Sequence, residues 1–97
     1  MRWTWSELKN YQNRSKHGIS FETAQLVFED SLALSRPDPH PDGDRWRTIG
    51  RIGAATLFVV HPWPDWETVA GDHVGRIISA RKATPRERHA YEEDANG

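Results

Sequence analysis

The sequence contains no cysteine and no long hydrophobic run, and its charges nearly cancel. The absence of cysteine excludes disulfides, a thiolate nucleophile and any zinc site built on cysteine. The longest uninterrupted apolar stretch, LFVV at 57–60, is far shorter than the roughly 20 residues of a membrane-spanning helix. The first residues, MRWTWSEL, lack the apolar segment of a signal peptide. These absences predict a cytoplasmic protein with no membrane segment.

Apolar and charged residues are both plentiful in this short chain. Hydrophobic residues make up 36% of it and include five tryptophans, which is enough for a packed core. A chain of 97 residues builds one modest core, so we expect one domain over residues 1–97. The net charge of −1 argues against a nucleic-acid coat protein, but a local cluster of positive charge can still bind phosphate.

A first helix is predicted near the N-terminus. The segment TWSE matches a capping box, in which the Thr4 hydroxyl and the Glu7 carboxylate each accept from the other residue's backbone amide. The helix should therefore begin near Trp5. It should end near His17, because Gly18 suits the left-handed residue that follows a helix.

A second helix should run from its N-cap Ser20 to about Asp30. Its apolar positions recur at helical spacing: Phe21, Ala24, Val27 and Phe28. The segment 31–44 contains three prolines and Asp-Gly, so we expect a short strand at 32–35 followed by a loop.

Three further strands are predicted from β-branched and apolar residues, at 45–53, 55–62 and 73–83. A tight turn at Gly53 should join the first two as an antiparallel hairpin. LFVV is expected to be the buried central strand. A loop at 63–72 should precede the last strand.

A final helix is indicated by Thr84 as N-cap, Pro85 in the first helical position and Glu87 three residues after the cap. The predicted order is two helices, four strands and one helix. We therefore expect an α+β domain in which two N-terminal helices and a C-terminal helix shield a four-stranded, mostly antiparallel sheet.

Arginine is concentrated in the predicted strands. Alternate residues of a strand share a face, so Arg45, Arg47 and Arg51 should lie on one side of the sheet. The segment at 76–93 adds a second cluster: Arg76, Arg81, Lys82, Arg86 and Arg88. Guanidinium groups bind phosphate oxygens bidentately and stay charged at neutral pH. We expect arginines from separate strands to converge on one pocket for a polyanion; the alternative is that each is a solvated or ion-paired surface residue.

Cleaving RNA without a metal requires a group that moves the proton of a 2′-hydroxyl and cations that stabilise the phosphorane. His17, beside Lys16, is the best candidate for proton transfer, because histidine titrates near neutral pH. The alternative is that His17 only caps the helix end. Four residues of the last helix are reserve candidates or simply an exposed helical face: Glu87, His89, Tyr91 and Glu92.

Other features carry weaker chemical signals. The segment DPHPD offers Asp38, His40 and Asp42 as metal ligands, but its prolines favour a turn, and we expect no metal or cofactor. Walker, GxGxxG and HExxH motifs are absent. Trp63 and Trp66 are expected near the surface, where they would mark a contact patch.

Several segments, spread over nearly the whole chain, form a recognisable set: W-x-E-x-K-N from Trp5, NRSKHGISFETA (13–24), VFED (27–30), RWRTIG (45–50) and RIISARKATPRERHAYE (76–92). Together they resemble the BrnT family of ribonuclease toxins from bacterial type II toxin–antitoxin modules, which have a RelE-like fold. The resemblance implies metal-independent cleavage of mRNA and growth arrest. It also implies neutralisation by a BrnA-like antitoxin, which covers the active face and carries the contact with operator DNA.

The resemblance also implies functional residues. The implied catalytic group is Lys16, His17, Arg51, Arg76 and Arg81, and the implied RNA-binding group is Arg45, Arg47, Lys82 and Arg86. His17 would act as general acid or base, and the cations would bind phosphate and stabilise the transition state. The connection at 63–75 is longer than the usual hairpin of the family, which bears on the antitoxin contact.

Two other functions remain open at this level. Stackable tryptophans and the lack of an unmistakable catalytic pair suit a non-catalytic RNA-binding module. A pure interaction domain, which exists to pair with its antitoxin, is the third possibility.

Overall fold

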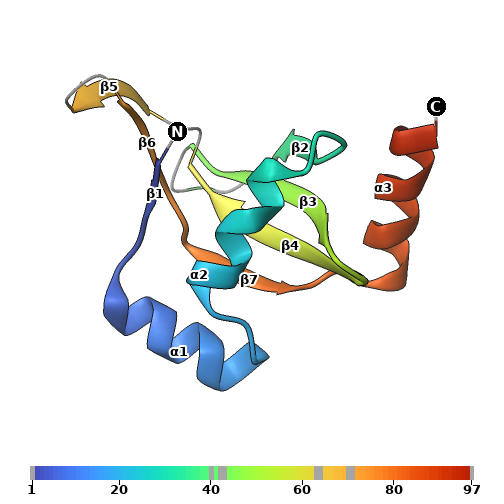
Figure 1. The fold of residues 1–97 in the computed structure, drawn as a ribbon, viewed down its shortest axis with the longest axis horizontal. Helices are drawn as coiled ribbons and strands as arrows, with labels where there is room; N and C mark the ends of the chain where they lie inside the picture. Colours follow the sequence, from blue (N-terminus) through green and yellow to red (C-terminus); the bar gives the residue numbers. More distant parts are fainter. Residues whose placement is uncertain (1, 40, 42–43, 63–64, 70–71, 97) are drawn as a thin grey trace.

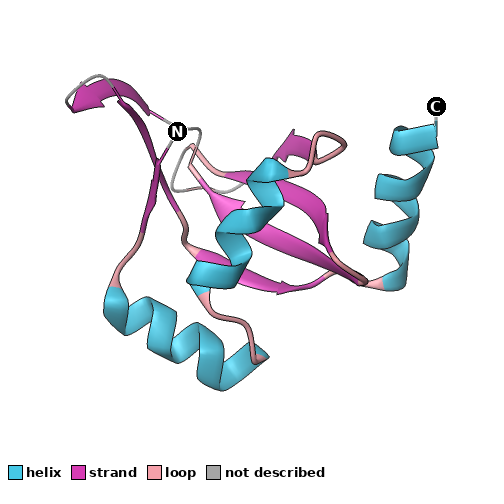
Figure 2. Cartoon of the chain, in the orientation of Figure 1, coloured by secondary structure: helices cyan, strands magenta, loops and turns pink. Residues whose placement is uncertain are grey.

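The computed structural model describes residues 2–39, 41, 44–62, 65–69 and 72–96, with only the backbone described for 65–69, 72, 73 and 96. The elements follow in the order β1 (Arg2–Thr4), α1 (Glu7–His17), α2 (Phe21–Ala24), the 3₁₀ helix η1 (Gln25–Glu29), β2 (Leu34–Pro37), β3 (Trp46–Ile52), β4 (Ala55–His61), β5 (Asp65–Val69), β6 (Asp72–Arg76), β7 (Ser79–Lys82) and α3 (Pro85–Asn96). Within these residues, the helices and the four-stranded antiparallel sheet confirm the predicted α+β class (Figure 2). None of the described helices is long and apolar enough to cross a membrane.

The described strands form two sheets (Figure 1). One is antiparallel throughout, with the order β2-β3-β4-β7. The other has the order β1-β6-β5, with β1 and β6 parallel. This second sheet was not predicted, because β1 is only three residues long and β5 falls within the expected loop at 63–72. Residues 63–64 and 70–71 of that loop lie outside the described part of the chain.

The predicted strand at 73–83 is wrong as a single element, since its two halves belong to different sheets. The amide of Ile77 donates to the carbonyl of Thr4 at 2.9 Å, whereas the amide of Ile78 donates to the carbonyl of Val60, also at 2.9 Å. Consecutive amides therefore serve β1 and β4, and the chain crosses between the sheets at this point. This crossing left no sign in the sequence, because Ile77 is fully buried and the apolar residues on both sides of the crossing look like one continuous strand.

The capping predictions were correct at three helix ends and wrong at one. Ser20 caps α2, Gly18 follows α1 with φ of 73°, and Thr84 exchanges backbone-to-side-chain hydrogen bonds with Glu87 at the start of α3. The expected cap Thr4 instead lies in β1, where its hydroxyl donates to the carbonyl of Gly75. Ser6 caps α1 in its place. The second helix also differs from the prediction, because after four residues it tightens into the 3₁₀ helix η1.

The two faces of the four-stranded sheet bury different clusters. On one face Leu57 and Val59 pack with residues of α2 and η1, among them Phe21 and Val27. Gly50 makes this packing possible, because a Cβ at this position would lie 2.6 Å from the side chain of Val27. The other face carries a smaller cluster of Ile49, Phe58 and Tyr91, the last from α3. Burial from both sides explains the continuous apolar run LFVV, which is the predicted central strand.

The edge of this sheet at β7 is closed by a side chain of α1. Asn13 is buried; its amide nitrogen donates to the carbonyl of Ala80 at 2.8 Å, and its oxygen accepts from the amide of Ala80 at 3.0 Å. The same nitrogen donates to the carbonyl of Ile19 at 2.9 Å. The side chain thus pairs with the edge strand as a neighbouring strand would, and it ties α1 to the sheet.

We predict that Asn13→Ala lowers the free energy of unfolding by about 3 kcal/mol, because it leaves buried backbone groups of Ala80 and Ile19 without partners. Urea denaturation followed by circular dichroism measures the loss. Gln12→Ala is the matched control, because Gln12 is the exposed neighbour on the same helix, and a change below about 0.5 kcal/mol is expected. Equal effects of the two substitutions would contradict the role of Asn13.

Candidate nucleic-acid interface

Arginines lie on the face of the four-stranded sheet that α3 only partly covers. Arg47 shares this face with Ile49, and Arg36 of β2 is directly opposite Arg47 in the register. In the next row Ile49 faces Phe58, which faces Arg81 of β7. Two like charges directly opposite each other destabilise a strand pair. Arg36 and Arg47 nevertheless occupy opposite positions of β2 and β3 on one face of the sheet.

These side chains border a groove between the sheet and the N-terminal half of α3. Its volume is about 420 Å³, and it is lined by Leu34, Arg36, Arg47, Ile49, Phe58, Thr84, Arg86, Glu87 and Ala90. Leu34, Ile49 and Phe58 give the groove an apolar floor, and three arginines also line the groove. Arg36 and Arg86 form no ion pair with a described residue, while Arg47 is 3.9 Å from the Asp38 carboxylate. An anionic ligand with an apolar part fits this composition.

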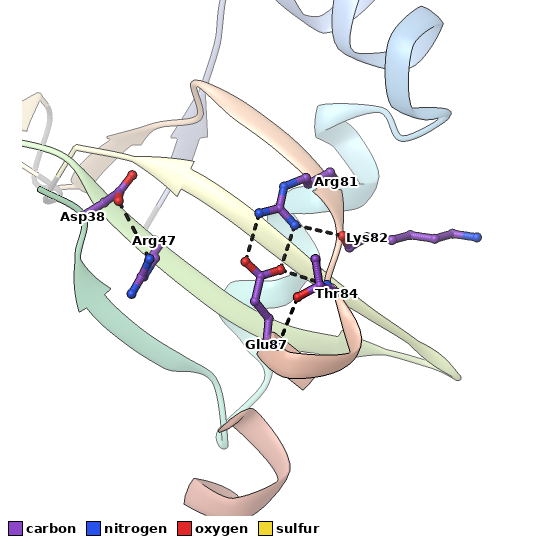
Figure 3. A network of polar contacts seen from close by, with 6 residues as sticks. All are labelled: Asp38, Arg47, Arg81, Lys82, Thr84 and Glu87. Carbon is purple, nitrogen blue, oxygen red and sulfur yellow. Dashed lines mark hydrogen bonds and ion pairs between the residues drawn. The ribbon is translucent and has the colours of Figure 1, made fainter. Parts of the chain in front are cut away.

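Arg81 adjoins the groove and is held by a bidentate ion pair with Glu87 (Figure 3). Its Nη1 donates to Glu87 Oε1 at 2.7 Å and its Nη2 donates to Oε2 at 2.9 Å. Nη1 also donates to the carbonyl of Lys82 at 3.2 Å. The guanidinium carbon lies over the ring of Phe58, 4.1 Å from its centroid. The pair thus joins β7 to the first turn of α3.

The hydrogen bonds from Arg81 lower the pKa of the Glu87 carboxyl, partial burial opposes this shift, and the amide of Thr84 adds to it. The same pairing raises the pKa of Arg81. Glu87 is therefore ionised throughout the neutral range and neutralises the charge of Arg81. Arg36, Arg47 and Arg86 carry most of the positive potential of the groove.

Arg51 lies outside this groove, although it shares the strand face with Arg47. It borders a second hollow with Tyr91, Asp30 and the exposed Leu26 and Leu32. The hydroxyl of Tyr91 donates to Asp30 Oδ2 at 2.6 Å, and the backbone amide of Arg51 donates to the same oxygen at 2.9 Å. Partial burial raises the pKa of Asp30, but these hydrogen bonds together lower it by more, so the net shift of the pKa is downward.

The other predicted site residues are also distributed over separate parts of the protein. Arg76 is exposed on β6, in the three-stranded sheet. Lys82 lies opposite Leu57, so its side chain leaves the other face of the sheet, and Figure 3 shows it pointing away from the ion pair. Lys16 and His17 lie at the C-terminal end of α1, and no hydrogen bond or ion pair joins them to described residues of the groove.

Some predicted features are only partly described. Arg45 accepts a hydrogen bond from the amide of Asp38 through its carbonyl, at 2.8 Å, just before β3. In the DPHPD segment Asp38 is near Arg47, while His40 and Asp42 lie outside the described residues. The same holds for Trp63 and for the side chain of Trp66. Among the described residues, no group of three or more His, Asp or Glu side chains could hold a metal ion.

A buried histidine that the sequence did not single out lies on the opposite face of the sheet. His61 Nδ1 is 2.7 Å from the carbonyl of Pro62, and its Nε2 is 2.7 Å from the hydroxyl of Thr48. Burial lowers the pKa of His61, and the hydrogen bond to Pro62 opposes that shift. A neutral ring therefore donates from Nδ1 to the carbonyl and accepts at Nε2 from Thr48. This pairing is structural and has no access to the groove.

A family model described as "Ribonuclease toxin, BrnT, of type II toxin-antitoxin system" matches residues 5–87. The matched range includes all of the four-stranded sheet and ends at the partner of Arg81. The chain belongs to the BrnT family. A search of curated proteins found no match. Membership makes the chain a ribonuclease toxin of a type II toxin–antitoxin system, for which an antitoxin protein is the implied partner.

The groove of this BrnT family member contains one arginine that the sequence analysis missed. Arg36 lies in β2, which begins two residues later and extends two residues further than the predicted strand at 32–35. The prolines after it suggested a loop, and one of them, Pro37, is the last residue of β2. Leu34 and Arg36 alternate along the strand as Ile49 and Arg47 do, and the two pairs lie opposite each other. This alternation indicates that Arg36 lies on the same face as Arg47, but only if the register of the two strands is known.

We predict that Glu87→Gln lowers the free energy of unfolding by about 1–2 kcal/mol at pH 7, because it removes the charge-assisted bonds to Arg81. A folded-state pKa below the ordinary 4.5 means that this contribution is complete above about pH 4.5 and is lost as the pH falls through the folded value. The difference between wild type and variant should therefore shrink in acid.

Urea denaturation at pH 7 and at pH 3 tests this prediction. Glu93→Gln is the control, because Glu93 is 71% exposed and its partner is the exposed His89. Its effect should stay below about 0.5 kcal/mol at both pH values. A destabilisation by Glu87→Gln that is independent of pH would contradict an ionic role for Glu87.

Proposed function

We propose that the protein is an endoribonuclease toxin that cleaves mRNA without a metal ion and binds its substrate in the groove between the sheet and α3. The observation that supports this most directly is the set of guanidinium groups, Arg36, Arg47 and Arg86, over an apolar floor. Guanidinium groups bind backbone phosphates and stabilise the charge that develops on a phosphorane. They supply at the phosphate the positive charge that a metal ion supplies in other nucleases.

The partner in this proposal is a BrnA-like antitoxin, which neutralises the toxin and carries the contact with operator DNA. The chain's own net charge of −1 supports a division of labour in which the antitoxin makes the DNA contact. Growth arrest follows when toxin exceeds antitoxin.

We predict that the double substitution Arg47→Ala and Arg86→Ala reduces cleavage of single-stranded RNA at least about 100-fold, because two phosphate-binding cations are lost. The assay is the shortening of a labelled RNA on a gel, in the presence of EDTA. The control is Lys9→Ala with Arg14→Ala, which removes the same charge from exposed positions of α1. Cleavage by the groove variant at the wild-type rate would overturn the site assignment.

His17 is the proposed proton carrier, although the structure places it on α1, away from the residues that line the groove. If it transfers a proton in the reaction, His17→Ala should slow cleavage about 10²- to 10⁴-fold and leave the affinity for RNA unchanged. Gln12→Ala, at an exposed position of the same helix, is the control. Full activity of the His17 variant would remove this residue from the mechanism.

The alternative function is RNA binding without cleavage. It is favoured by one observation: no histidine among the described residues lines the groove, and the carboxylate that does, Glu87, is held by Arg81. RNA retention that weakens with salt, with no shortening of the RNA in the gel assay, would establish this alternative.

A further inference from the structure

Arg81, which adjoins the groove, differs from the arginines that line it because its terminal nitrogens already have partners. Both terminal nitrogens donate to Glu87, and one also donates to the carbonyl of Lys82. A phosphate that approached this edge would meet the ionised Glu87 carboxylate. Arg81 is therefore poorly suited to bind phosphate, whereas Arg36 and Arg86 form no ion pair with a described residue.

The planar faces of the Arg81 guanidinium are in a different situation. The guanidinium carbon lies over the ring of Phe58, a side chain that is itself 93% buried. The Arg81 side chain is nevertheless 36% exposed. Phe58 and Glu87 thus hold the guanidinium, while part of the Arg81 side chain stays open to solvent. Arg36 and Arg47 lie in the neighbouring row of the same sheet face.

We propose that the Arg81 guanidinium, held between Phe58 and Glu87, is a stacking platform for an unpaired base of single-stranded RNA. This inference rests on the proposed function, because it requires RNA in the groove. Guanidinium planes stack on nucleobases, and stacking accepts every base because each has a π face. Arg36, Arg47 and Arg86 hold the phosphates next to that base. The groove thus recognises a nucleotide through two separate groups of residues.

The test compares two 2′-O-methyl oligonucleotides of equal length, one carrying bases and one abasic. Neither can be cleaved through a 2′-hydroxyl, so binding is measured apart from catalysis. Fluorescence anisotropy of labelled oligonucleotides gives the affinities of wild type, Arg81→Lys and Arg86→Lys at several salt concentrations. Both substitutions keep the charge and remove the planar group, so Arg86→Lys is the matched control.

Wild type should bind the base-carrying oligonucleotide more tightly than the abasic one. Arg81→Lys should weaken binding of the first about 5- to 100-fold and change binding of the abasic strand less than about 2-fold. Arg86→Lys should affect both oligonucleotides equally. A 2-aminopurine base in the oligonucleotide should be quenched by wild type and much less by Arg81→Lys, a change that a loss of folding stability alone would not produce at full binding.

Other outcomes separate the proposals. If Arg81→Lys weakens both oligonucleotides equally, Arg81 does not act through the base and the stacking inference is wrong, while the proposed function stands. Equal affinities of wild type for the two strands overturn the stacking inference even if Arg81→Lys does not fold. Failure of wild type to bind either strand overturns the proposed function itself.

Discussion

The bidentate ion pair between Arg81 and Glu87 holds the two walls of the groove together. Arg81 belongs to the edge strand β7 and Glu87 to the first turn of α3, so the pair sets where the helix begins relative to the sheet. Helix α3 is mostly polar. Among its described side chains Tyr91 is the buried one, and its hydroxyl donates to Asp30. Polar contacts at two points along the helix therefore do much of the orienting that an apolar stripe does in other helices.

Alternate side chains of β3 and β4 point to opposite faces of the sheet, one of which holds the larger core and the other the groove. The face toward α2 and η1 is filled by the larger core and holds the buried pair of Thr48 and His61. The face toward α3 is only half covered, and its charged residues continue the same rows as Ile49 and Phe58. The groove thus lies where the N-terminal half of α3 borders this face without filling the space above it. Its apolar floor is formed by Ile49 and Phe58, which also belong to the smaller buried cluster.

Local signals in the sequence predicted the helix ends at Gly18, Ser20 and Thr84 correctly, because each depends on hydrogen bonds within a few residues. The N-terminal cap failed because Thr4 competes for a distant partner, the carbonyl of Gly75, in a parallel strand pair. The second sheet was not predicted because it also depends on this distant pairing of β1 with β6. Its parallel pairing joins residues about 70 positions apart, and no local pattern reports such a pairing.

The site was harder to predict than the fold, because linear charge density does not determine where side chains gather. Arg51 and Arg47 share a strand face, but Tyr91 packs over Ile49 and Phe58. The Arg51 guanidinium lies over the Tyr91 ring, 3.5 Å from the Glu92 carboxylate. The crossing between the sheets also separates the residues of the basic segment 76–88. Arg76 lies on the second sheet, and Lys82 lies on the opposite face of the first. Arg81 is paired with Glu87, Arg88 is near Glu92, and Arg86 lines the groove. Arg36, which comes from a segment rich in proline, completes the groove. Whether an arginine is available to a ligand of the groove depends on its position and on any carboxylate at its donor edge, and both follow from strand register and helix placement.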